Sequence, residues 1–293
     1  MTAVRERPAS DGLAGRFVDL HAHSTASDGS RTPADVVAAA RSAGLAAIAL
    51  TDHDTMAGVN EAMAAGETLG VRVVPGVELS AMEGEREVHV LGLHVEHVEP
   101  IEDTLATLRD RRVVRAQEIV HKLNALGVPI TFEAVLAQAG RGAIGRPHVA
   151  RVLISEGWAR DSRDAFDRYL GAGKPAFVPK HRLTVAEAID LIHTGGGLAL
   201  LAHPGPEGRR DAVERYAAIG LDGLEVRHPG HNSEDTSRLG ALVDFFGLVP
   251  SGGSDWHGAS DGPRTLGVMR VPGEWLDRQD ARVASRRAGA RVA

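Results

Sequence analysis

Hydrophobic residues along the chain follow two alternating patterns. Short apolar runs, such as residues 45–50 and 198–202, are typical of buried strands. Each is followed by a segment whose apolar residues recur every three or four positions, as on one face of a helix. The first helical segment has clear boundaries, because Thr32 can cap it and Gly44 can end it. Strands that alternate regularly with helices predict a parallel sheet covered by helices.

This alternation stops in the middle of the chain. Residues 99–180 read as several helices without strands, and the strand pattern resumes afterwards. The sequence therefore predicts an α/β fold, a barrel of about seven strands rather than the complete eight-fold form. We expect a discontinuous barrel domain (residues 16–98 and 181–275), a helical insertion (99–180), a flexible lead (1–15) and a C-terminal tail (276–293) that is a loose helix or disordered.

Composition narrows the classes of function. The chain of 293 residues carries a formal net charge of −6 and only 4% aromatic residues, which argues against binding of long duplex or stacked single-stranded nucleic acid. Because it has no cysteine, disulfides, thiolate metal ligands and cysteine nucleophiles are excluded. No apolar run reaches membrane-spanning length, and residues 1–15 lack the apolar core of a signal peptide. We expect a cytoplasmic protein without membrane association.

Two histidines end the first predicted strand. Side chains alternate faces along a strand, so Asp19, His21 and His23 share one face while the apolar residues between them share the other. Two imidazoles spaced in this way can reach one metal ion. An isolated pair of this kind is more often simply hydrogen-bonded or exposed, so the pair alone does not indicate a metal site.

Further residues of metal-ligand type follow or lie on the other predicted strands. They are His53, Glu78, His89, His203, Asp255 and His257. One end of a parallel barrel gathers such positions, and barrel enzymes place their chemistry there. Imidazole and carboxylate ligands without thiolate suit manganese, iron or zinc, and the set is too large for one ion. We predict two or three divalent ions, with Mn²⁺ as first choice. Closely spaced divalent ions favour phosphate-ester hydrolysis by a bridging hydroxide.

The motifs HxHSxxSDG, TDHD, GVE, VHVLG, LAHP and SDxH together closely resemble those of the polymerase and histidinol phosphatase (PHP) family, from about Phe17 to His257. The resemblance implies a distorted (βα)7 barrel with a trinuclear metal centre. One ion would take His21, His23, Glu78 and Asp255. A second would share Glu78 and take His89 and His203, and a third would take Asp28, His53 and His257.

Cationic residues outside this set are candidates for binding substrate phosphate. They are Arg146 and His148 in GRPH, Lys174 in GAGKP, and Arg227, His228 and His231 in EVRHPGH. Each has a structural alternative, such as covering a helix start or pairing with an acid, and family members often carry an uncharged residue in place of Arg227. The basic residues near Arg115 read as a solvated helix face.

The helical insertion with GRPH resembles the branch of the family that contains nucleoside 3′,5′-bisphosphate phosphatases, AMP phosphatases and 5′-end exoribonucleases of short RNA. We therefore expect a phosphatase that acts on a nucleoside 3′,5′-bisphosphate or on the 5′ end of a short oligoribonucleotide, with the insertion capping the substrate. AMP or histidinol phosphate is the nearest alternative substrate. A non-catalytic PHP accessory module is a second alternative. A barrel hydrolase of C–N bonds is a third, although such enzymes usually need a strand-end lysine. The sequence does not indicate an oligomeric state.

Overall fold

The computed structural model describes residues 13–139, 144–179 and 182–290, and it divides the chain into two compact units. Met1–Glu102 and Leu183–Ala293 form one unit, called the barrel unit, and Asp103–Arg182 form the other, called the helical unit. Most of the expected flexible lead lies outside the described residues. Leu13, near its end, is buried in the barrel core.

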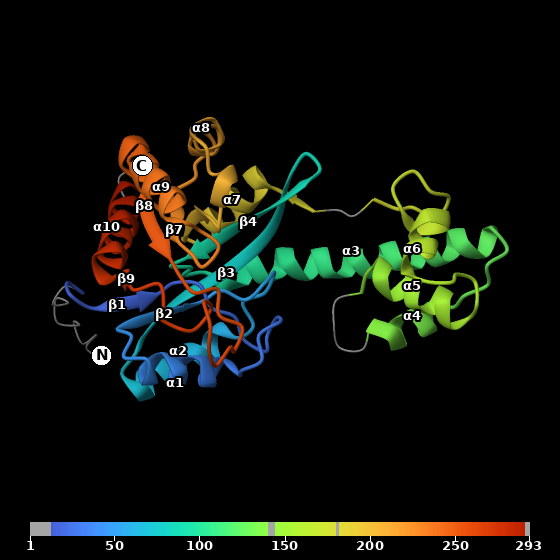
Figure 1. The fold of residues 1–293 in the computed structure, drawn as a ribbon, viewed down its shortest axis with the longest axis horizontal. Helices are drawn as coiled ribbons and strands as arrows, with labels where there is room; N and C mark the ends of the chain where they lie inside the picture. The colour runs from blue at the N-terminus through green and yellow to red at the C-terminus, as the bar shows by residue number, and fades with distance from the viewer. Residues whose placement is uncertain (1–12, 140–143, 180–181, 291–293) are drawn as a thin grey trace. The chain divides into compact units, whose positions relative to one another are not determined.

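One sheet of nine strands organises the barrel unit (Figure 1). Its order is β8-β7-β6-β4-β3-β2-β1-β9, and β5 pairs with β3. The strands are β1 (Phe17–Asp19), β2 (Ala47–Leu50), β3 (Arg72–Glu83), β4 (Arg86–Leu93), β5 (Leu183–Thr184), β6 (Leu198–Leu201), β7 (Gly223–Arg227), β8 (Val249–Gly252) and β9 (Val271–Pro272). Beyond β1, Leu20 N donates to Gly252 O at 3.0 Å and Ala22 bridges to Trp256, so β1 and β8 nearly close the barrel. The predicted α/β barrel is confirmed.

The expectation of an all-parallel barrel is wrong at β4. This strand is antiparallel to both of its neighbours, β3 and β6. The cause is the tight turn between Glu83 and Arg86, because two strands joined by a short hairpin must run in opposite directions. His89 therefore lies near the beginning of its strand, opposite Ser80 of β3, and still reaches the carboxyl end of the parallel strands.

Six helices lie wholly within the described residues of the barrel unit. They are α1 (Pro33–Ser42), α2 (Val59–Leu69), α7 (Val185–Thr194), α8 (Arg210–Ala218), α9 (Ser233–Phe246) and α10 (Gly273–Ala290), and η2 (Gly205–Glu207) is a short 3-10 turn. Thr32 caps α1 by accepting from Asp35 N, as predicted. Residues 276–290 of the expected tail belong to α10, which lies beside β8 and β9 (Figure 1). Although its sequence is mostly polar, Leu276 and Val283, seven residues apart, are both buried and attach the helix to the core.

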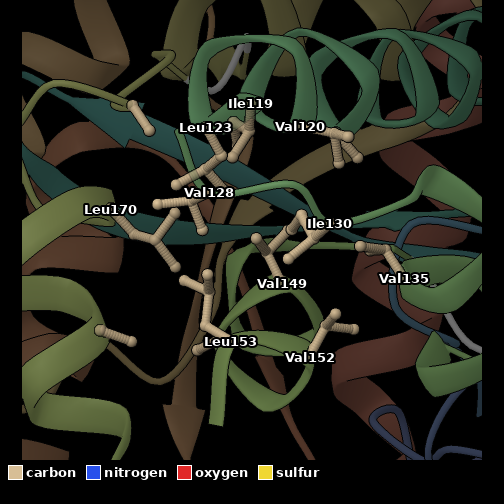
Figure 2. Packing of buried hydrophobic residues seen from close by; sticks show 14 of the residues in the cluster. Ile119, Val120, Leu123, Val128, Ile130, Val135, Val149, Val152, Leu153 and Leu170 are labelled. Atoms are coloured by element: carbon tan, nitrogen blue, oxygen red, sulfur yellow. The ribbon is translucent and has the colours of Figure 1, made fainter. Parts of the chain in front are cut away.

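The helical unit has its own hydrophobic core. Its elements are α3 (Val98–Ala125), which begins in the barrel unit, then α4 (Phe132–Ala139), α5 (Arg146–Ser155), α6 (Ser162–Ala165) and η1 (Phe166–Leu170). Ile119 and Leu123 of α3 pack with Val149 and Leu153 of α5 and with Leu170 (Figure 2). This burial makes the unit a compact body rather than a loop. Among the described helices, none is long and apolar enough to cross a membrane.

Candidate metal centre

The nine predicted ligands come together at one end of the barrel. His21 and His23 follow β1, and both are fully buried. The backbone of His23 donates to Trp256 O at 2.8 Å, which ties this segment to the residues after β8. Asp28 lies in the loop between β1 and α1. The remaining ligands follow β2, β6 and β8 or lie on β3 and β4; they are His53, Glu78, His89, His203, Asp255 and His257.

Glu78 is the centre of this group. Five imidazole nitrogens lie within 3.3 Å of its two carboxylate oxygens, those of His21 (3.1 Å), His23 (3.3 Å), His53 (3.3 Å), His89 (2.8 Å) and His203 (2.9 Å). Only those of His21, His89 and His203 have hydrogen-bond geometry, and a carboxylate with about four lone-pair positions cannot serve all five imidazoles. Five imidazolium ions around one carboxylate would also repel one another. Divalent cations shared between these side chains would resolve both problems.

The charges of the surrounding groups keep the acids in this centre ionised. Burial alone would raise the pKa of Glu78, but the charge of His21 and a hydrogen bond from His203 hold that pKa well below its ordinary value. Burial also opposes ionisation of Asp255, and a hydrogen bond from His228 together with the nearby charges of His21 and His23 brings its pKa far below the usual range. Both side chains are therefore carboxylates, the form that binds metal ions.

His23 provides the test of whether the site fits metal ions. Both of its ring nitrogens are buried, and neither makes a hydrogen bond of acceptable geometry. Its Nε2 nevertheless lies 3.1 Å from Asp255 Oδ1 and 3.3 Å from Glu78 Oε2. A buried polar atom without a partner is costly, and ligation of a shared ion would satisfy it. The donors are nitrogen and oxygen only, a set that suits manganese, iron or zinc.

The donor atoms fall into three overlapping groups in the described part of the chain, and within each group they lie within 4.8 Å of one another. The first is His21, His23, Glu78 and Asp255; the second is His53, Glu78 and His89; the third is His23, Asp28, His53 and His257. The first equals the set that the family resemblance implies for one ion. In the second, His53 stands where His203 was expected, although His203 Nε2 is 2.9 Å from Glu78 Oε1.

Asp28 reaches the third group from a loop. Its Oδ1 lies 3.2 Å from His257 Nε2 and its Oδ2 lies 3.9 Å from His53 Nε2, while 58% of the side chain is exposed. The loop folds tightly because Gly29 allows close approach: a Cβ there would lie 2.6 Å from His23 O. Asp52 holds the start of the loop by accepting from the Ser24 backbone at 2.7 Å.

Comparison with known proteins places this arrangement in a family. Residues 19–172 match the sequence profile of the PHP domain. The chain belongs to the PHP-domain family. A 3′,5′-nucleoside bisphosphate phosphatase from Chromobacterium violaceum is 35% identical over 257 residues, which cover 85% of this chain and 90% of that protein. A 5′-3′ exoribonuclease from Haemophilus influenzae is 37% identical over 245 residues, 82% of this chain and 89% of the relative.

A solved structure shares the fold. A candidate metal-dependent phosphoesterase from Bifidobacterium adolescentis is 33% identical, with a TM-score of 0.66 over 92% of this chain and 96% of that one. The PHP-domain protein described here is accordingly a phosphoesterase, a hydrolase of phosphoric ester bonds.

Three of the predicted substrate-binding residues of this PHP protein lie around β7. His228 is buried beside the ligands: its Nδ1 accepts from Gly230 N at 3.0 Å, and its Nε2 lies 3.4 Å from Asp255 Oδ2. Both ring nitrogens of His231 are used by the backbone, through Val226 O and Gly205 N, each at 3.0 Å. His231 thus supports the loop that follows His203, whereas His228 faces the centre.

The structure gives Arg227 a different environment from the one expected. Its guanidinium lies over the Trp275 ring at 5.3 Å and donates to the Arg270 carbonyl. The cause is a register shift between Glu225 and Arg227, which interrupts the alternation of faces along β7. Glu225 points into the barrel, while Arg227 packs against α10. These contacts stabilise the fold and leave Arg227 without a place in the proposed substrate site.

The predicted residues of the helical unit occupy mainly structural positions. His148 Nδ1 accepts from Gly145 N at 3.0 Å and so caps the beginning of α5. Arg146 donates to Leu170 O at 3.0 Å and lies over the rings of Phe166 and Phe177. Lys174 is an exposed loop residue. Phosphate binding by these residues stays a prediction.

Glu225 is a buried acid that the sequence pattern did not single out. Its Oε1 accepts from His21 Nδ1 at 3.0 Å, and its Oε2 accepts from His203 N at 2.6 Å. The first bond fixes the proton of His21 on Nδ1 and leaves Nε2 free toward Glu78 and Asp255. One sequence feature could have identified Glu225: it is an acid two residues before the end of an apolar strand, on the face that points into the barrel.

We expect Glu225→Gln to weaken metal binding by about 10- to 100-fold, because an amide supports His21 without the negative charge. Titration of the metal-free variant with Mn²⁺ measures this affinity. The exposed acid Glu214 of α8 provides the matched control, Glu214→Gln. Equal Mn²⁺ affinities in Glu225→Gln and wild type would contradict the role of Glu225.

Proposed function

We propose that this PHP phosphoesterase removes a terminal phosphate from a nucleotide, with a nucleoside 3′,5′-bisphosphate or the 5′ end of a short oligoribonucleotide as its substrate. The observation that carries the proposal is the set of three overlapping donor groups around Glu78, with the unsatisfied imidazole of His23 among them. We infer that these groups hold two or three divalent ions, Mn²⁺ first among them and Fe²⁺ or Zn²⁺ next. When bound, such ions supply Lewis acidity toward a phosphoryl group and acidify a water molecule.

The chain's own side chains prepare this chemistry. Glu225 orients His21, and Glu78 and Asp255 supply fixed negative charge for the ions. Because Nδ1 of His228 accepts a backbone hydrogen bond, its Nε2 carries the proton, beside Asp255. We infer that His228 donates a hydrogen bond from this atom to the phosphate of the substrate.

The helical unit contains a cluster of positive charge that suits an anionic ligand. Arg115 was expected on a solvated face, but its Nε donates to Val178 O at 2.9 Å, and its buried Nη2 has no partner in the described part of the chain. Burial, together with the charges of Arg146, Arg182 and Arg112, lowers the pKa of Arg115 to about 10. An anion with several phosphate oxygens would relieve this repulsion and satisfy the buried donor.

The names of the relatives favour the same substrates. One is a phosphatase of 3′,5′-nucleoside bisphosphates and the other an exoribonuclease. The complete ligand set argues against a non-catalytic accessory module. The described strand ends carry no lysine, which argues against the hydrolysis of C–N bonds.

A substrate panel tests the proposal. With Mn²⁺ present, we expect kcat/KM to be highest for adenosine 3′,5′-bisphosphate or a 5′-phosphorylated oligoribonucleotide, compared with AMP and histidinol phosphate. Arg115→Gln is expected to lower kcat/KM for the bisphosphate by about 10- to 100-fold, the loss of one charge-assisted contact, and to change AMP hydrolysis little.

The exposed Arg111 of α3 is the matched control, and Arg111→Gln should resemble wild type. Faster hydrolysis of AMP or histidinol phosphate than of the bisphosphate would contradict the proposed substrate and identify the faster compound as the preferred one. Absence of hydrolysis across the whole panel would contradict the proposed function.

A further inference from the structure

Arg264 is a cation beside the metal centre that the sequence pattern did not indicate. It lies in the loop between β8 and β9, nine residues after Asp255. One of its terminal nitrogens, Nη1, forms an ion pair with Asp255 Oδ2 and also lies 3.3 Å from Asp255 O. The side chain is 46% exposed, so it borders the solvent as well as the buried acid.

The two oxygens of Asp255 face different partners. Oδ1 lies 3.1 Å from His23 Nε2 and 3.5 Å from His21 Nε2, among the candidate metal ligands. Oδ2 is paired with Arg264 and lies 3.4 Å from His228 Nε2. Because an ion bound at Oδ1 lies about 2 Å from it, Arg264 and His228 border the place where a phosphoryl group would bind that ion.

The loop that carries Arg264 is held in place on both sides of this residue. Gly267 N donates to the buried Asp19 Oδ2 at 2.9 Å, and Leu266 is itself buried in the core. On the other side, Trp256 Nε1 donates to Ala259 O at 2.8 Å. A guanidinium on such an anchored loop is positioned before any ligand arrives, which lowers the entropic cost of binding.

The remaining donors of Arg264 have no partner among the residues that the structure describes. A guanidinium has five N–H groups, and those of Arg264 that bond to the described residues all belong to Nη1. Nε and Nη2 form the edge that pairs with two oxygens of a phosphate. Arg227 also bonds through Nη1 alone, but its partners are the Met269 and Arg270 carbonyls and its guanidinium lies over the Trp275 ring, not beside Asp255.

We propose that Arg264 is a phosphate-binding residue of this centre: Asp255 holds one edge of its guanidinium, and the free edge binds non-bridging oxygens of the phosphoryl group that is cleaved. This inference rests on the proposed function and names a specificity determinant of the same site. Bound in this way, Arg264 neutralises charge that develops on those oxygens and favours a terminal, doubly charged phosphate over a diester.

The probe is inorganic phosphate, because the hydrolysis of any phosphomonoester releases it. We expect Arg264→Gln to keep the metal content of wild type by elemental analysis and to bind phosphate about 10- to 100-fold more weakly in calorimetric titration of the Mn²⁺-loaded protein. Arg264→Lys should give an intermediate affinity, because it keeps the charge and loses the planar fork. Arg278 of α10 is 47% exposed and provides the matched control, Arg278→Gln, with wild-type affinity.

Unchanged phosphate affinity in Arg264→Gln would overturn the inference. A loss of metal content in proportion to the loss of phosphate binding would also overturn it, since Arg264 would then act only as a support for Asp255. The outcome is independent of the substrate panel. If the wild-type protein binds phosphate through Arg264 but hydrolyses no ester, the proposed function is contradicted, while the inference that Arg264 binds phosphate is supported.

Discussion

Glu78→Gln is expected to abolish metal binding at the centre of the site and to lower kcat/KM by well over about 100-fold, a loss already typical when an outer partner of a metal ligand is removed. Glu78 belongs to two of the three donor groups and contacts five histidines. The amide is isosteric but neutral, so it binds divalent ions poorly and leaves the imidazoles without their central charge.

Metal counted by elemental analysis and phosphate released from a nucleotide substrate measure the effect of Glu78→Gln. The exposed Glu85, in the turn between β3 and β4, supplies the control Glu85→Gln, which should match wild type. A circular dichroism spectrum establishes that the variant is folded. Full metal content in a folded Glu78→Gln protein would contradict the central position given to this residue.

Gly253→Ala is expected to have the second large effect, although glycine has no chemistry of its own. A Cβ at this position would lie against His21 Cβ, 2.5 Å from the His21 backbone nitrogen and 2.8 Å from Asp19 Oδ1. The segment of His21 and the residues before Asp255 must therefore separate. Overpacking of this kind costs about 1–3 kcal/mol in the free energy of unfolding. A shift of about 1 Å in a site of this kind lowers activity by about 100-fold.

Urea denaturation and kcat measured on the same preparation test Gly253→Ala. Gly240 of α9 is the control, because a Cβ there meets no atom within 4 Å. Gly240→Ala should be neutral or should stabilise the protein by about 0.5–1 kcal/mol, since glycine weakens a helix. Wild-type stability and activity in Gly253→Ala would show that the barrel does not need this close approach.

The sequence could indicate which histidines and acids meet at one end of the barrel, because strand alternation is a local rule. The spacing of His21 and His23 places both imidazoles on the inner face, and both are buried there. Glu78 and Asp255 could be named as candidates because each is an acid within or shortly after a predicted strand. The predicted direction of β4 was wrong because either a hairpin turn or a crossover can follow a strand. Only the shortness of the two-residue turn after β3 distinguishes the hairpin from a crossover.

The errors arise where tertiary contacts override the local pattern. A bulge in β7 separates Arg227 from the inner face that Glu225 occupies, and alternation alone cannot predict a bulge. Arg115 reads as a surface cation on a charged helix, and only the packing around Val178 buries part of it. The pairing of Arg264 with Asp255 joins a loop to the site, and nothing in the sequence around Arg264 specifies that contact.

The most direct test of the account counts metal ions and phosphate release in the same samples of the full-length chain. We predict about two or three divalent ions per chain in the active protein, loss of nucleotide phosphatase activity when a chelator removes them, and its return with added Mn²⁺. Activity that survives complete removal of the ions would contradict the account, and so would a fully metal-loaded protein that hydrolyses no phosphate ester.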